Sequence, residues 1–167
     1  MSGDLADLAR SIIDANLYLT LGTAGRDGRP WVSPVYFATA DYIDFYWVSD
    51  AGAMHSRNLA RRPQGSMVIF DSRVPTYTGR AVYLLGEAFE LSGSNIDRGL
   101  AIYPGAPERG AGSLTRDEVV PPAPYRLYSA RVSEHFVSCP RDIGRPCPLH
   151  GIDVDHRASV TLTRQAG

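Results

Sequence analysis

Short runs of alternating apolar and polar residues recur along most of the chain, and they constrain the fold more than any other feature. Such alternation is the period of a β-strand that buries one face. Seven such runs, joined by short or Gly- and Pro-rich links and accompanied by few helices, predict a mainly β chain folded as an antiparallel β-barrel. The runs cover Leu17–Leu21, Trp31–Thr39, Ile43–Ser49, Ser66–Asp71, Arg80–Leu91, Tyr125–Val137 and Ala158–Thr163.

Glycine, proline and capping residues predict where these runs turn or break. The Asp-Gly pair within Gly25–Pro30 predicts a hairpin turn between the first two runs. Pro34 lacks a backbone N–H, which indicates an edge strand, a bulge or a break in pairing. Gly86 predicts a bulge or a close backbone approach, and Thr115 with Glu118 has the spacing of a capping box. Helical spacing of apolar residues is found at residues 4–15 and Asn95–Tyr103.

The stretch Phe45–Pro63 carries the clearest indication of a ligand. An apolar run ends in the turn Asp-Ala-Gly-Ala, which leads into a short helix with His55 in its first turn. The first N–H groups of a helix lack internal partners and lie at its positive end, where a phosphate gains donors. Ser56 adds a hydroxyl and Arg57 a planar cation, and a hydrogen bond to a charged group contributes about 1.5–3 kcal/mol. We therefore predict an anion site here.

A simpler interpretation of the same stretch stays open. Arg57, Arg61 and Arg62 are also compatible with a solvated helix face, and Ser56 is compatible with a helix cap. Such a motif is a hypothesis until its structural context is known.

Composition excludes several classes of function. The content of 44% hydrophobic and 21% charged residues is ordinary for a globular protein, and a length of 167 residues predicts a single domain over 1–167. A net charge of -1 leaves no diffuse basic field, so we expect no nucleic-acid partner. The sequence has no apolar run near the roughly 20 residues that cross a bilayer and no secretory-signal pattern at its start. We therefore expect a cytoplasmic protein without a membrane partner.

Known nucleotide and hydrolase motifs are missing from the sequence. There is no P-loop, no G-x-G-x-x-G after a strand and no G-x-S-x-G elbow, and the carboxylates are scattered. Hydrolytic and nucleophilic chemistry therefore has no support, and the pattern identifies no catalytic residue.

Five potential metal ligands lie near the C-terminus. Two cysteines are too few for a disulfide scaffold and fit a reducing compartment, although they are close enough in sequence to form a disulfide over a short loop. The spacing C-x7-C-x2-H matches none of the tight pairs of zinc ribbons. We therefore predict inert thiols, surface histidines and no metal, with a metal-stabilised tail, which would contain stoichiometric zinc, as the alternative. The residues concerned are His135, Cys139, Cys147, His150 and His156.

The order of the motifs resembles a known family. A leading helix and an Asp-Gly hairpin are followed by WVSPV, FYWVS, HSRNL and RAVYLLGEA segments in that order. Together they resemble the pyridoxamine 5'-phosphate oxidase-like, FMN-binding split-barrel proteins. The resemblance spans a core of about residues 5–137 and leaves a tail at 138–167.

The resemblance implies a six-stranded antiparallel split barrel of Greek-key type that forms a homodimer. It also implies one FMN in each of two clefts between the subunits. Carried over residue by residue, the resemblance implies that the isoalloxazine ring is lined by Trp31, Val32, Ser33 and Pro34 and flanked by Trp47, Val48 and Ser49. It implies that the phosphate and ribityl chain face His55, Ser56, Arg57 and Asn58, and that the ring is approached by Arg80 and Ala81.

Two departures from the family pattern alter these expectations. His55 stands where the family usually has a lysine, so we expect the phosphate contact to depend on pH. The arginine and histidine pattern by which true pyridoxamine phosphate oxidases hold their substrate is not found near the C-terminus. Oxidation of vitamin B6 is therefore not expected.

A free-energy comparison favours the dimer. Micromolar affinity requires about 8 kcal/mol. Two or three charge-assisted bonds give about 4–9 kcal/mol, and association costs at least about 4 kcal/mol, so the flavin ring must also be buried. The leading hypothesis is a flavin-dependent oxidoreductase that acts on an unidentified small molecule with a donor such as NAD(P)H. The alternatives are a deazaflavin-dependent reductase and a non-catalytic flavin- or haem-binding protein.

Overall fold

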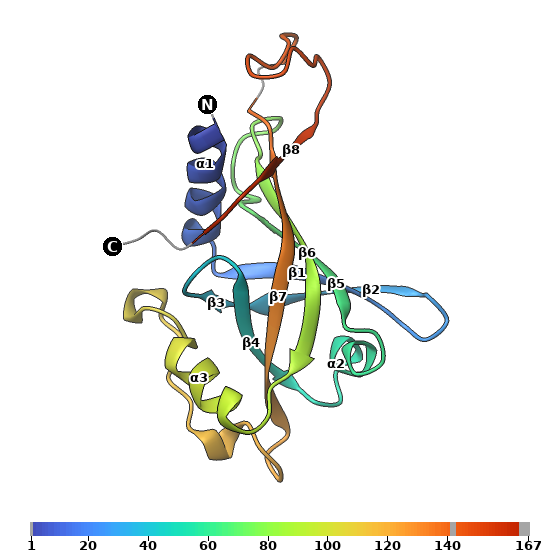
Figure 1. The fold of residues 1–167 in the computed structure, drawn as a ribbon, viewed down its shortest axis with the longest axis vertical. Helices are drawn as coiled ribbons and strands as arrows, with labels where there is room; N and C mark the ends of the chain where they lie inside the picture. Colours follow the sequence, from blue (N-terminus) through green and yellow to red (C-terminus); the bar gives the residue numbers. More distant parts are fainter. Residues whose placement is uncertain (1, 141–142, 164–167) are drawn as a thin grey trace.

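The computed structural model describes residues 2–140 and 143–163, which form a strongly curled antiparallel sheet with helices at its margins (Figure 1). The predicted mainly β, antiparallel split-barrel fold is confirmed. Within the predicted tail, residues 141–142 and 164–167 lie outside the described part of the chain. Among the helices of the described residues, none has the length and apolarity of a membrane span.

The strands follow one another in the order β2-β1-β5-β6-β7-β4-β3, and β8 pairs with β7. Every pair of neighbours is antiparallel. In chain order the strands are β1 Tyr18–Ala24, β2 Pro30–Tyr36, β3 Ala38–Thr39, β4 Asp44–Asp50, β5 Gln64–Phe70, β6 Ala81–Glu90, β7 Tyr125–Ser138 and β8 Arg157–Val160.

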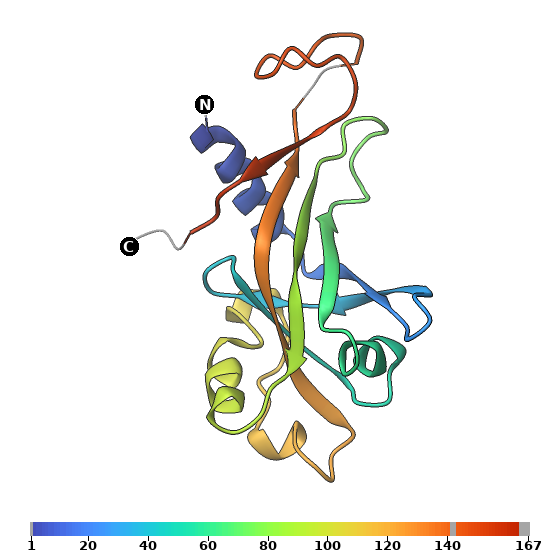
Figure 2. The same cartoon turned by 45° about the vertical axis from the view of Figure 1, so that its right-hand side comes forward.

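The helices occupy three margins of the sheet. In Figures 1 and 2, α1 lies beside β8, α2 follows β4, and α3 lies at the end of the sheet opposite α1. The apolar face of α1 packs into the main core, where Leu5, Ala9 and Ile13 are buried with Leu84. The helices are α1 Ser2–Ala15, α2 Met54–Leu59 and α3 Ser94–Ile102, with short 3-10 turns η1 Pro107–Arg109 and η2 Arg116–Glu118.

One predicted strand is divided in two. The run Trp31–Thr39 pairs with β1 as far as Tyr36 and with β4 from Ala38 onward. Because β2 and β3 are opposite ends of the sheet order, the buried Phe37 between them joins the two edges and curls the sheet on itself. Within residues 2–140 and 143–163 the sheet therefore has eight strands instead of the six that the resemblance implies.

Most local signals in the sequence are confirmed. Gly28, in the predicted hairpin turn, has a φ of 83°, which glycine adopts without strain. Pro34 lies on β2, the end strand of the sheet, as a missing N–H requires. The Thr115–Glu118 capping box is present at η2.

The sheet is bent where Gly86 meets β7. The register between β6 and β7 shifts at Leu85/Gly86, which confirms the predicted bulge. A Cβ on Gly86 would lie 2.2 Å from the carbonyl oxygen of Arg131 and 2.9 Å from the Cα of Val132. Because both neighbours are backbone atoms, they cannot rotate away.

We predict that Gly86→Ala destabilises the protein by about 1–3 kcal/mol, because the added methyl forces β6 and β7 apart. Urea unfolding of this variant and of Gly112→Ala, where a Cβ meets nothing within 4 Å, provides the measurement and its matched control. Equal free energies of unfolding for the two variants would contradict the close approach at the bulge.

Candidate functional site

The predicted phosphate-binding residue His55 lies at the junction of β2, β4 and α2. Its ring Nδ1 is 3.1 Å from Ser33 Oγ on β2, and its Nε2 is 2.9 Å from Ser49 Oγ on β4. The side chain is only 8% exposed. Three of the predicted site residues are thus brought together, and the imidazole binds two hydroxyls of its own chain.

The bonds around this ring form a chain that continues to the surface. A neutral imidazole has one donor and one acceptor nitrogen, so one serine hydroxyl donates to the ring and the other accepts from it. The indole Nε1–H of Trp31 donates to Ser33 Oγ at 3.0 Å. Trp31 is therefore oriented by the same hydroxyl that contacts His55.

Burial lowers the pKa of His55 below its ordinary value of 6.5. The ring is therefore neutral at pH 7, and it cannot serve as the fixed cation that a lysine would supply at this position. The nearby permanent charge is instead the guanidinium of Arg57.

The other predicted residues of α2 divide into buried and exposed positions. Ser56 is buried and donates to the carbonyl oxygen of Asp50 at 2.8 Å, while Asn58 Nδ2 donates to Thr23 Oγ1 at 3.1 Å. These bonds fix the six-residue helix to β4 and β1. Arg57 is exposed, and its guanidinium donates to the carbonyl oxygen of Gly52.

Two of the residues predicted to flank the flavin have side chains that lie away from His55. Trp47 is fully buried and stacks on Tyr128, with the ring centroids 5.8 Å apart. Val48 points to the opposite face, where it packs on the smaller cluster of Ile96 and Leu127. Alternation along β4 leaves only Ser49 facing His55.

Arg80 and Ala81 do not join the other predicted residues within one chain. Ala81 pairs with Phe70 at the far end of β5, whereas α2 precedes the opposite end at Gln64. A seven-residue strand spans about 20 Å, so one protomer cannot place Arg80 beside His55.

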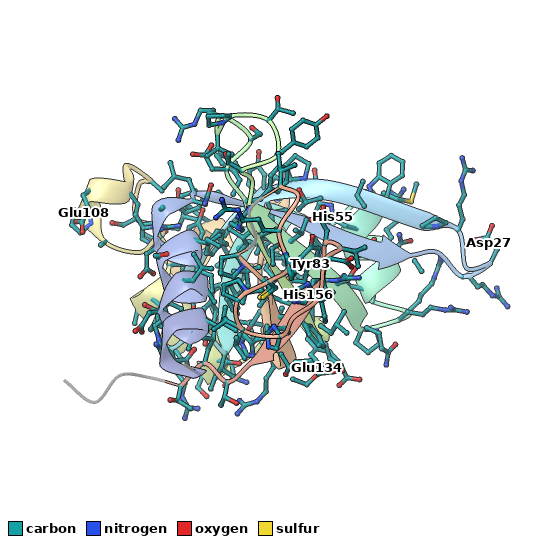
Figure 3. The ribbon with its side chains drawn as sticks, turned by 90° about the horizontal axis from the view of Figure 1, so that it is seen from above. Asp27, His55, Tyr83, Glu108, Glu134 and His156 are labelled. Atoms are coloured by element: carbon teal, nitrogen blue, oxygen red, sulfur yellow. The ribbon has the colours of Figure 1, made fainter. Side chains whose placement is uncertain are left out.

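The surface next to α2 is apolar and open. On β2, Trp31 is 46% exposed and Val32 is 65% exposed, and Pro34 is exposed beside the half-buried Ser33. A cavity of about 220 Å³ lies where the β1–β2 hairpin meets α2. Figure 3 shows Asp27, one of its lining residues, at the outer tip of that hairpin. The lining residues are Gly25, Asp27, Arg29, Pro30, Trp31, Met54 and Asn58.

Two further cavities extend along the outer face of the sheet. One of about 330 Å³ is lined by Val32 of β2, Leu85 of β6 and other residues, and one of about 910 Å³ lies between the β5–β6 loop and the tail. Tyr83, labelled in Figure 3, and Arg157 line both cavities, and the Arg157 guanidinium lies 4.6 Å from the centre of the Tyr83 ring. No pattern in the sequence predicts this pair, because the contact depends on β8 pairing with β7.

The part of the chain that matches a known protein family is the same core that carries this site. The family model described as pyridoxamine 5'-phosphate oxidase matches residues 5–119, which include β2, β4 and α2. No curated protein matches the chain by sequence.

Solved structures share the fold at low sequence identity. A heme-binding protein from Mycobacterium smegmatis has 19% identity and a TM-score of 0.63 over 92% of this chain, which spans 57% of that protein. The heme storage protein HutZ from Vibrio cholerae has 17% identity and a TM-score of 0.61, covering 77% of this chain and 90% of that one. A protein described as F420 reductase has 20% identity and a TM-score of 0.52, covering 75% of this chain and 94% of that one.

We predict that stability falls as the pH is lowered from about 7.5 to about 5. The folded state resists protonation of His55, whose pKa is lowered, so the unfolded state binds more protons in this window. Burial lowers the pKa of His135 in the same direction. Thermal melts should therefore show a pH dependence that is reduced, not abolished, in His55→Gln. An unchanged pH dependence in this variant would contradict the lowered pKa of His55, because it would mean that folding leaves this pKa unaltered.

Proposed function

The chain belongs to the pyridoxamine 5'-phosphate oxidase family, and on that premise we propose that it is a flavin-dependent oxidoreductase that holds FMN against β2 and α2. The observation that carries this proposal is the exposed indole of Trp31, which lines one cavity with Met54 of α2, together with the exposed guanidinium of Arg57, which contacts Met54. An apolar wall suits the flat ring of a flavin, and a guanidinium suits its phosphate.

Different residues of this surface would hold the ring and the phosphate of FMN. Trp31 gives the ring an apolar surface to bury, and the Ser33 hydroxyl holds the indole in place. Val32, the next residue of β2, points to the opposite face and lines the cavity with Val68 and Leu85. The bonds from Ser56 and Asn58 fix α2, so that Arg57 is presented on a rigid element. Bound FMN would supply the redox chemistry, with a donor such as NAD(P)H and an unidentified small molecule as acceptor.

A second copy of the chain completes the proposed site. One protomer offers a single wall to the ring, and the outer face of β2, β5 and β6 is apolar at Val32, Val68 and Leu85. A homodimer formed through this face would bury these side chains and close the flavin against a partner. It would also allow Arg80 of one copy to approach the flavin held by the other, which the separation within one chain does not permit.

Flavin is favoured over haem by the positions of the histidines. Haem iron is commonly held by a histidine, and all four histidines of the sequence lie in the described part of the chain. His55 binds two serines, His135 Nε2 lies 2.6 Å from the carbonyl oxygen of Tyr42, and His150 and His156 contact each other. Haem binding without turnover and a deazaflavin coenzyme are the competing functions, and titration with each compound distinguishes them.

We predict that Arg57→Ala weakens FMN binding by about 10- to 100-fold and leaves riboflavin binding nearly unchanged. The factor corresponds to the loss of one charge-assisted hydrogen bond to the phosphate, which riboflavin lacks. Quenching of flavin fluorescence gives both dissociation constants. Arg61→Ala, which removes an exposed arginine just beyond α2, is the control and should behave as the wild type.

Equal losses for FMN and riboflavin would contradict the phosphate contact. Wild-type protein that takes up haem or the deazaflavin coenzyme but no FMN would overturn the cofactor assignment. Reduction of the bound flavin by NAD(P)H, followed by stopped-flow reoxidation with candidate acceptors, tests turnover. Rates no faster than those of free FMN would favour storage or sensing.

We predict that Val32→Glu converts the dimer to monomers and weakens FMN binding, because it places a charge in the apolar face. Sedimentation velocity measures the oligomeric state. Val74→Glu, at an exposed valine of the β5–β6 loop outside the lining of these cavities, should remain dimeric. A wild-type monomer that binds FMN tightly would contradict the shared site.

A further inference from the structure

Four side chains converge where the chain leaves β7 and returns to β8. Cys139 directly follows β7, His156 directly precedes β8, and Cys147 and His150 come from the loop between them. One ligand atom from each of the four residues lies within 4.8 Å of all the others. Figure 3 labels His156 on this loop, which also protrudes at the top of Figures 1 and 2.

Most separations between the ligand atoms are close to those of a tetrahedral metal site. The two sulfur atoms are 3.1 Å apart, His150 Nδ1 lies 3.4 Å from Cys139 Sγ and 3.6 Å from Cys147 Sγ, and the nearest nitrogens of the two histidines are 3.2 Å apart. Zinc bonds of about 2.3 Å to sulfur and about 2.0–2.1 Å to nitrogen place two nitrogens about 3.3 Å apart, a nitrogen and a sulfur about 3.6 Å apart, and two sulfurs about 3.8 Å apart. The distances that involve nitrogen agree with these values, and the two sulfurs would move apart when zinc binds.

Further hydrogen bonds orient one histidine and one cysteine of the cluster. His156 Nδ1–H donates to the carbonyl oxygen of Val154 at 3.0 Å, which leaves the Nε2 lone pair facing the cluster. The backbone N–H of Leu149 points to Cys147 Sγ at 3.4 Å. The bond from His156 Nδ1–H, on the ring nitrogen that does not face the cluster, is the usual support of a metal-binding histidine.

The backbone of the loop fixes the same arrangement. The N–H of Cys139 donates to the carbonyl oxygen of His156 at 3.0 Å, and the N–H of Cys147 donates to that of Ile152 at 2.7 Å. Both cysteines are buried, being 6% and 1% exposed. Two buried thiolates would balance the charge of one divalent cation.

We propose that Cys139, Cys147, His150 and His156 bind one zinc ion that fastens β8 and the tail to the end of β7. Four protein ligands fill the coordination sphere, so the site is structural and not catalytic. A disulfide between the two cysteines would account for the sulfurs alone and leave the convergence of two imidazole nitrogens unexplained. This proposal replaces the expectation of inert thiols and surface histidines, and the metal analysis below decides between them.

Zinc at this position would stabilise more than the loop. β8 pairs with β7 from His135 to Ser138, and Leu162 beyond it is buried in the main core with Leu5 of α1. Cys139 and His156 also line the cavity of about 910 Å³. Removing the metal should therefore lower Tm and loosen this wall of the cavity.

The test is the metal content of the full-length protein purified under reducing conditions in zinc-containing medium. We expect about one zinc per chain, and loss of that zinc in Cys147→Ser and in His150→Ala. Ile143→Ala, at an exposed position of the same loop, and His55→Gln are the matched controls and should keep the metal. Because His55→Gln alters only the proposed flavin site, failure of that proposal leaves the zinc result unaffected.

Cobalt provides a readout that does not depend on how well the variants fold. Wild-type protein stripped with a chelator and titrated with Co²⁺ should gain thiolate-to-cobalt charge-transfer bands and the strong visible bands of tetrahedral cobalt, and Zn²⁺ should displace them. Wild-type protein without zinc and without these bands would overturn the proposal. A Cys139–Cys147 disulfide in the reduced preparation, or full zinc retention in Cys147→Ser, would also overturn it.

Discussion

The antiparallel pairing of β7 with its neighbours is the constraint on which the rest of the structure depends. This fourteen-residue strand pairs with β6, with β4 and, at its end, with β8. At one end it fixes β4, whose Ser49 lies opposite Arg126 and leads toward α2. At the other end it places Cys139 next to the returning chain at His156. The proposed cofactor surface and the proposed zinc site are therefore positioned by the same strand.

At the proposed cofactor surface, the buried polar groups are hydrogen-bonded within the chain, and the outer side chains are open to a ligand. Buried polar groups are costly unless they are hydrogen-bonded, and the serine–histidine bonds around His55 meet that requirement without a ligand. These bonds set the orientation of Trp31, while Arg57 stays at the surface. The protein thus presents a rigid apolar wall and a cation, and its own folding does not need the ligand that would bind there.

The sequence predicts local structure well because alternation and turn chemistry act over a few residues. The strand runs, the bulge at Gly86 and the edge position of Pro34 are of this kind. It could not tell which face of β4 points inward, so Trp47 was expected beside the flavin although it lies in the core. The sequence also does not predict how far apart residues on different strands lie in the folded sheet. That limit applies to Arg80, which lies a strand length from α2, and to Cys139 and His156, which meet only because β8 returns to β7.

The central claim is that a flavin nucleotide lies between two copies of this chain, with its ring on β2 and its phosphate at α2. A crystal structure of the protein with FMN tests this most directly. The account predicts density for the ring against Trp31, for the phosphate at Arg57, and for a second protomer that covers the ring. FMN bound elsewhere, or a lone protomer with the flavin open to solvent, would contradict it.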